Sequence, residues 1–172
     1  MNLKKKLCLA LAMATISCVA LASCGKNEDS SNNSANNANA NVSVSDTVDV
    51  TAVADKLQSD ITYVDTLTEL NSDMIKKLFG LEEGTDYKAG KVYVGSGGAT
   101  AEEIACFEAN DADGAAKIKT ALEDRINAQR TAFENYQPQE MDKLNNPVLV
   151  ARDNYVFMCI SDDNTKAEEI IG

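Results

Sequence analysis

Residues 111–138 read DADGAAKIKTALEDRINAQRTAFENYQP, and this stretch decides the fold class of the 172-residue chain. Its large apolar residues recur at the spacing of an amphipathic helix. Asp111 or Asp113 can cap the start of this helix, and Gln137-Pro138 ends it. The predicted apolar stripe consists of Ile118, Leu122, Phe133 and Tyr136, with Ala115 and Ile126 on its edge.

Two polar residues, Arg125 and Gln129, fall in the middle of this apolar stripe, so we expect their side chains to face the helix–sheet interface. Burying such groups costs several kcal/mol unless they have partners. One interpretation is structural: Arg125 pairs with a carboxylate on the sheet such as Glu103, and Gln129 binds a strand edge or a loop carbonyl. The other is a polar pocket in which Arg125, Gln129 and Tyr136 bind a carboxylate or phosphate group.

The long helix is flanked by two predicted β-hairpins. Strand-like residues 91–95 and 102–108 are joined by the turn at 96–99, and residues 147–152 and 155–161 are joined by Asp153-Asn154. This order predicts an α+β fold with a four-stranded, mainly antiparallel sheet. We expect the long helix and the shorter helices to pack on one face of the sheet. The shorter helices are predicted at residues 50–61, 71–79 and 162–171.

The N-terminal segment has the layout of an export signal. Three lysines at residues 4–6 precede an uncharged apolar run, residues 7–20, which is too short to span a bilayer comfortably. The sequence Leu-Ala-Ser-Cys at 21–24 resembles the lipobox of bacterial lipoproteins. That resemblance implies cleavage before Cys24 and acylation of its thiol. The alternatives are an ordinary signal peptide with an incidental Cys24, and a weaker competing site that ends at Cys18.

These features divide the chain into three parts. Residues 1–23 are the predicted lipoprotein signal peptide. Residues 24–47 form the lipid anchor and a linker rich in Ser, Asn and Ala, which cannot bury enough apolar surface to offset the entropy of ordering. Residues 48–172 suit a single α+β domain. The expected location is the outer face of the cell membrane, where the chain is attached through lipid on Cys24.

Composition excludes several classes of function. The formal charge is −11, and removal of residues 1–23, which hold three lysines and no acid, takes it to −14. A chain this acidic repels nucleic acid, so none is expected as a partner. Histidine is absent from the sequence, which removes the commonest general base and transition-metal ligand. We therefore predict no catalytic residue, no metal and no cofactor.

The remaining cysteines of the domain, Cys106 and Cys159, lie in apolar strand-like runs. In an exported protein they could form one disulfide. We favour the alternative that both are free thiols that behave as small buried apolar side chains.

Several motifs of the domain resemble a bacterial lipoprotein family, domain of unknown function 4358. The family has no established activity, so the resemblance implies a lipoprotein but no reaction. The residues that carry it are Leu78-Phe79-Gly80, Glu103-Ile104, Phe107, Asp111-Ala112, Arg125, Gln129, Phe133, Tyr136-Gln137-Pro138 and Asn154-Tyr155-Val156.

Two functions from different classes follow. The first is a membrane-anchored extracytoplasmic lipoprotein that acts as a non-catalytic binding or accessory module of the cell envelope, with an unknown envelope protein or small ligand as its partner. The alternative is an envelope hydrolase with an unrecognised active site. The first is favoured because Glu102 and Glu103 are adjacent and would face opposite sides of a strand, so they cannot form a catalytic carboxylate pair.

Overall fold

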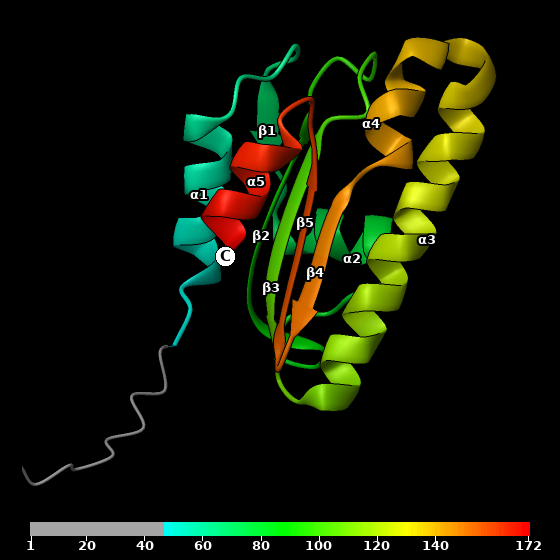
Figure 1. Cartoon of the computed structure of the whole chain (residues 1–172). Coiled ribbons are helices and arrows are strands. Elements are labelled where there is room, and N and C mark those ends of the chain that lie inside the picture. Colours follow the sequence, from blue (N-terminus) through cyan, green and yellow to red (C-terminus); the bar gives the residue numbers. More distant parts are fainter. Residues whose placement is uncertain (1–46) are drawn as a thin grey trace, which may run out of the picture. The chain divides into compact units, whose positions relative to one another are not determined.

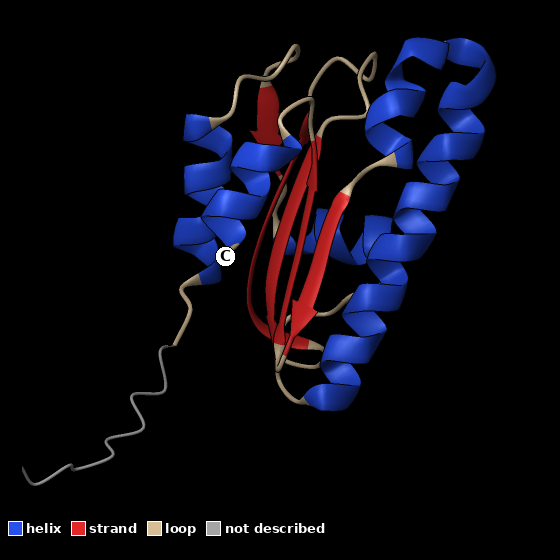
Figure 2. Cartoon of the chain, in the orientation of Figure 1, coloured by secondary structure: helices blue, strands red, loops and turns tan. Residues whose placement is uncertain are grey.

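The computed structural model describes residues 47–172, which form a β-sheet with helices on both faces (Figures 1 and 2). This arrangement confirms the predicted α+β class. The elements are α1 Val50–Asp60, β1 Leu67–Glu69, α2 Ser72–Phe79, β2 Tyr87–Gly95, β3 Glu103–Ala109, α3 Ala112–Tyr136, the 3₁₀ turn η1 Pro138–Glu140, α4 Met141–Asn145, β4 Val148–Arg152, β5 Tyr155–Ile160 and α5 Asn164–Ile171.

The sheet has five strands, not the four predicted, in the order β1-β2-β3-β5-β4. Every neighbouring pair is antiparallel. The additional strand, β1, pairs with the end of β2, with Leu67 opposite Gly95 and Glu69 opposite Tyr93. The sequence pattern missed it because three residues are too few to show strand alternation.

The prediction that the helices cover one face of the sheet is wrong. Helices α2, α3 and α4 cover one face, while α1 and α5 cover the other (Figure 1). The physical reason lies in the central strands: β3 and β5 are apolar at almost every position, and both of their faces are buried. Strands of this kind need a covering layer on each side.

Each layer therefore has its own hydrophobic core. The core under α3 includes Tyr87, Phe107, Leu122, Met158 and Ile160. The core under α1 and α5 includes Leu57, Ile104, Phe157 and Ile171. None of the helices within residues 47–172 is both long and apolar enough to cross a membrane.

The ends of the helices follow the predicted capping residues. The Asp111 carboxylate accepts a hydrogen bond from the Gly114 N–H at the start of α3, and the helix ends before Pro138. At α2 the Asn71 side chain accepts from the Met74 N–H, and Gly80 closes the helix with φ of 69°. These caps fix the length of the two helices that enclose the cavity described below.

Phe107 packs directly over a glycine of the neighbouring strand. Gly90 lies opposite Phe107 in the β2–β3 register. A Cβ atom at Gly90 would come within 2.5 Å of the Phe107 Cδ1 atom. The missing side chain leaves room for this ring, which also meets Tyr87 edge to face with ring centroids 5.0 Å apart.

The two cysteines of the domain are free and buried, as favoured from the sequence. Cys106 lies opposite Phe157, and Cys159 lies opposite Ile104, so the two thiols are diagonal neighbours on one face of the sheet. Diagonal neighbours have Cα atoms about 7–8 Å apart, whereas a disulfide requires less than about 7 Å. Burial raises the pKa of both thiols, which keeps them protonated.

Candidate ligand-binding site

A cavity of about 450 Å³ lies between α2, α3 and the neighbouring ends of β2 and β3. Two of its wall residues, Met74 and Leu78 on α2, are 49% and 39% exposed, although both are large and apolar. Helix α2 thus presents apolar surface to this space instead of burying it. The apolar walls are completed by Leu70, Val94 and Phe133.

The floor of the cavity is the ion pair between Arg125 and Glu103. Arg125 Nε and Nη2 lie 3.0 and 2.8 Å from Glu103 Oε2, and Nε also lies 3.2 Å from Oε1. The Glu103 side chain is 1% exposed, and the Arg125 side chain is 25% exposed. The partner predicted for Arg125 is thereby confirmed, and the guanidinium both pairs with the sheet and lines the cavity.

Gln129 donates to the same carboxylate through Nε2, at 2.6 Å from Glu103 Oε2. The expected partner was a strand edge or a loop carbonyl, and this prediction is wrong. Residues 125 and 129 are one helical turn apart, so both reach the first residue of β3. Because a carboxylate paired with Arg125 only accepts hydrogen bonds, the amide nitrogen must face Glu103.

The carbonyl oxygen of Gln129 is consequently left without a partner. This atom, Oε1, is buried and makes no hydrogen bond with the described residues. Thr100 Oγ1, on a second residue that lines the cavity, is also buried and unpartnered. Leaving a buried polar atom unsatisfied costs about 1–3 kcal/mol. The cavity therefore holds two groups with unused hydrogen-bonding capacity.

Burial dominates the ionisation of Glu103. It raises the pKa of the carboxyl group, and the hydrogen bonds from Arg125 and Gln129 oppose that rise. With its oxygens taken by Arg125 and Gln129, Glu103 acts as an anchor for these side chains rather than as a free general base.

Tyr136 does not join the predicted polar group. Its side chain is 67% exposed and meets Phe133 edge to face, with ring centroids 6.4 Å apart. It is the last residue of α3, and it does not line the cavity. The expectation that Tyr136 faces inward is wrong, because two thirds of its side chain is exposed at the end of the helix.

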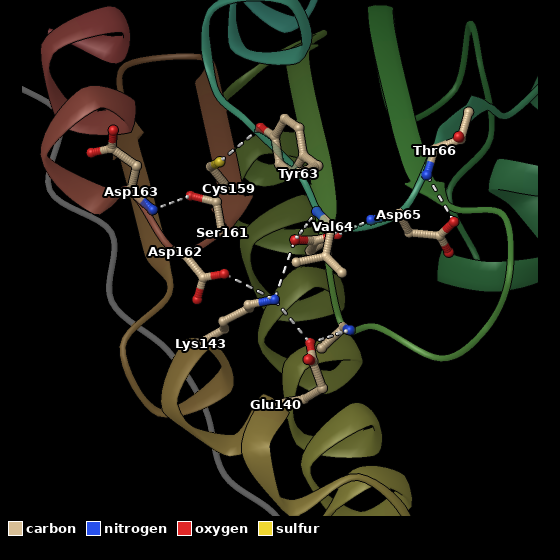
Figure 3. Close-up of polar contacts among 12 residues, drawn as sticks. Tyr63, Val64, Asp65, Thr66, Glu140, Lys143, Cys159, Ser161, Asp162 and Asp163 are labelled. Atoms are coloured by element: carbon tan, nitrogen blue, oxygen red, sulfur yellow. Dashed lines mark hydrogen bonds and ion pairs between the residues drawn. The ribbon is translucent and has the colours of Figure 1, made fainter.

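A second polar cluster, which the sequence did not predict, is centred on Lys143 (Figure 3) and shares Glu102 with the lining of the cavity. The ammonium group of Lys143 is 3.2 Å from Glu102 Oε1, Glu140 Oε2 and Asp162 Oδ2. Lys143, Glu102 and Glu140 are buried. Burial alone would lower the pKa of Lys143, but the hydrogen bonds to Glu102, Glu140 and Asp162 raise it above its ordinary value.

This Lys143 cluster joins several loops to the sheet. Glu102 accepts from the backbone N–H groups of Val64 and Asp65, and Glu140 accepts from the N–H of Ala101. One weak signal of this cluster is visible in the sequence: Glu140 and Lys143 are three residues apart. The short η1 and α4 segment has no apolar periodicity from which its burial could be predicted.

We assign the Lys143 cluster a structural role, because each of its carboxylates already faces a cation or N–H donors. Among residues 47–172, no group of three or more His, Cys, Asp or Glu side chains is placed so that it could hold a metal ion. The ammonium of Lys143 occupies the centre of the three carboxylates. Glu102 and Glu103, adjacent in sequence, serve different cations, Lys143 and Arg125.

The predicted lipidation residue, Cys24, lies outside the residues that the structure describes. The sequence model of the family "Domain of unknown function (DUF4358)" matches residues 59–161. The chain belongs to this family. The DUF4358 match covers all five strands together with α2, α3 and α4, so it includes the cavity and the buried residues Glu102, Glu140 and Lys143, while Asp162 lies just beyond it. No curated protein and no solved structure matches the chain.

Proposed function

We propose that this DUF4358 protein is a membrane-anchored extracytoplasmic lipoprotein whose domain is a non-catalytic binding module. The ligand site is the cavity between α2, α3 and the sheet. One observation carries this proposal: Gln129, which lines a cavity with apolar walls, has a buried Oε1 atom that makes no hydrogen bond with the described residues. A bound molecule that donates a hydrogen bond to this oxygen would satisfy it.

The environment of the carboxylates supports binding rather than hydrolysis. Both acidic residues that line the cavity are paired with cations, Glu102 with Lys143 and Glu103 with Arg125. Neither is free to act as a general base toward the Thr100 hydroxyl. An acid–base or nucleophile–base pair within hydrogen-bond reach is what a hydrolytic site requires.

The export signal supports the location. A short apolar run behind three lysines and a lipobox that ends at Cys24 are typical of a bacterial lipoprotein precursor. Two or more acyl chains would give stable attachment. Residues 24–47, rich in Ser, Asn and Ala, would act as a spacer between the lipid and the binding domain.

The proposal is tested by filling the cavity. Met74→Trp adds a large side chain to the cavity wall, and Tyr136→Trp places the same side chain on exposed surface as a matched control. The full chain in detergent micelles is titrated with a panel of small organic compounds of all charge types, and backbone amide signals are followed by NMR. We expect compounds that shift Val94 and Leu78 in the wild type and the Tyr136→Trp variant, but not in the Met74→Trp variant. No shift with any compound, or shifts that persist unchanged in Met74→Trp, would count against a ligand site here.

A further inference from the structure

We infer that the ligand of this cavity is an uncharged molecule with an apolar body and a polar head that both donates and accepts hydrogen bonds, as a carboxamide does. This inference rests on the proposed binding function and names the ligand class of the same site. Three properties of the cavity lead to it: its charge, its unused hydrogen-bonding groups and its walls.

The Arg125–Glu103 ion pair at the floor of the cavity is balanced in charge. Glu103 neutralises Arg125 through two guanidinium nitrogens, and Glu102 is held by Lys143. An anionic head would have to compete with Glu103 for the guanidinium, and a cationic head would lie against Arg125. Lys77, the other charged residue of the lining, is exposed at the rim, where water screens its charge. The carboxylate or phosphate expected from Arg125 in the sequence is therefore not the ligand that this floor favours.

The unpartnered polar groups of the cavity lining require a ligand head that both donates and accepts hydrogen bonds. Gln129 Oε1 can only accept, so the ligand must supply an N–H or O–H donor. The unpartnered Thr100 hydroxyl can donate or accept. The hydrogen bonds from Arg125 to Glu103 use Nε and Nη2, which leaves Nη1 as a donor for a ligand. A carboxylate head cannot donate to Gln129, and an ammonium head cannot accept from Thr100 or Arg125. A carboxamide does both within one small planar group.

The apolar walls of the cavity favour a ligand whose body is also apolar. Five apolar side chains surround the floor, and the space of about 450 Å³ lies within the usual range of about 300–1,000 Å³ for small-molecule sites. Met74 and Leu78 come from the short helix α2 and are partly exposed, so a bound apolar chain would cover them. The unbranched, flexible Met74 side chain can adapt to the shape of such a chain.

The inference is tested with three probes that share a six-carbon skeleton: hexanamide, hexanoate and hexylammonium. Each is titrated into the full chain in detergent micelles, and the amide signals of Val94, Leu78 and the Gln129 side chain are followed by NMR. We expect hexanamide to bind about ten-fold or more tightly than either charged probe, the factor that one well-placed hydrogen bond supplies.

Two variants test the contacts. Gln129→Met removes the unpartnered oxygen, with Gln139→Met on the exposed surface as its control, and Thr100→Val removes the hydroxyl at nearly constant shape. Hexanamide affinity should fall about ten-fold in Gln129→Met and less in Thr100→Val, while Gln139→Met binds as the wild type does. If Gln129→Met does not fold, as judged by its circular dichroism melt, Thr100→Val alone decides.

The failures of the two proposals are distinguishable. If a charged probe binds as tightly as hexanamide and Met74→Trp abolishes that binding, the cavity is a ligand site but the ligand class is wrong. If hexanamide binds no more weakly in Gln129→Met and in Thr100→Val, the inferred contacts are wrong. If none of the three probes shifts the cavity signals while other compounds of the panel do, the inference is overturned and the binding function stands.

Discussion

At the scale of single residues, Arg125 joins the fold to the cavity. Its guanidinium neutralises the buried Glu103 carboxylate, and the same side chain lines the cavity. Gln129 also has two distinct ends, since its nitrogen binds Glu103 and its buried oxygen has no hydrogen-bond partner among the described residues. The positions of both residues could be predicted, because helical periodicity places them in the apolar stripe. The unpartnered oxygen could not, because it depends on which atom of the amide faces Glu103.

Replacement of Arg125 tests the structural half of this role. Arg125→Met leaves Glu103 buried without its cation, and we expect a loss of about 3 kcal/mol or more in the free energy of unfolding at neutral pH. Adding Glu103→Gln to this variant should recover most of the loss, because no uncompensated charge then remains. Urea unfolding of the full chain in micelles measures both. If Arg125→Met alone were as stable as the wild type, the Arg125–Glu103 pair would contribute nothing to stability.

The stability lost in Arg125→Met should depend on pH, because the variant leaves the Glu103 carboxyl group without its cation. Burial already raises the pKa of this carboxyl group in the folded state, and removal of Arg125 takes away a group that opposes the rise. A carboxyl whose folded pKa is raised binds its proton more tightly when folded, so the stability it contributes is present at low pH and is lost as pH rises through the folded pKa. The deficit of Arg125→Met should therefore be smaller at pH 5 than at pH 8.

At the scale of elements, the long and strongly patterned segments were predictable and the short ones were not. The caps and length of α3, the caps of α2 and the two hairpins follow from residues a few positions apart. Strand β1, turn η1 and helix α4 have three to five residues each, so their structure comes from tertiary contacts. The Lys143 cluster, which holds this region together, is a contact of that kind.

Lys143 is predicted to be essential for these short elements. Lys143→Met leaves Glu102 and Glu140 buried without their ammonium partner, at an expected cost of about 3–5 kcal/mol in unfolding free energy. Lys166→Met is the matched control, because its pair with Glu169 is exposed and such pairs contribute about 0–1 kcal/mol. Denaturant unfolding of both variants makes the comparison. Equal losses would mean that burial of the cluster does not matter.

The same cluster predicts an alkaline transition. The pKa of Lys143 is raised in the folded state, so its stabilisation is complete below the unfolded lysine pKa of about 10.4 and is lost as pH rises through the folded value. Between these two values the wild type should lose stability through Lys143. Denaturant unfolding measured from pH 9 upward should show this loss of stability in the Lys166→Met control, which keeps Lys143. The loss should be smaller in Lys143→Met, which lacks the titrating group.

At the scale of the whole molecule, two cores on opposite faces of one sheet replace the arrangement that was expected, in which helices cover one face only. The apolar runs of β3 and β5 were visible as strands, but the number of layers that cover them depends on where α1 and α5 pack. Periodicity within a helix identifies its buried side, not the face of the sheet that it meets. The cavity was likewise beyond the sequence, because its walls come from three elements that are distant in the chain.

The molecule is predicted to be held at the membrane by lipid and not by its surface charge. With the signal segment removed, the chain would carry a formal charge of −14, and so acidic a protein is repelled by anionic headgroups. Attachment should therefore depend on lipid at Cys24. In cells that express Cys24→Ala, we expect the lipid mass to be absent and the protein not to be processed at this site, whereas Cys18→Ala should remain lipidated and in the membrane fraction. Fractionation with mass spectrometry of the N-terminal peptide measures both variants. Lipid-free wild-type protein, or a Cys24→Ala variant that is processed and retained like the wild type, would exclude Cys24 as the anchor, and the cavity would then belong to a domain delivered in another way.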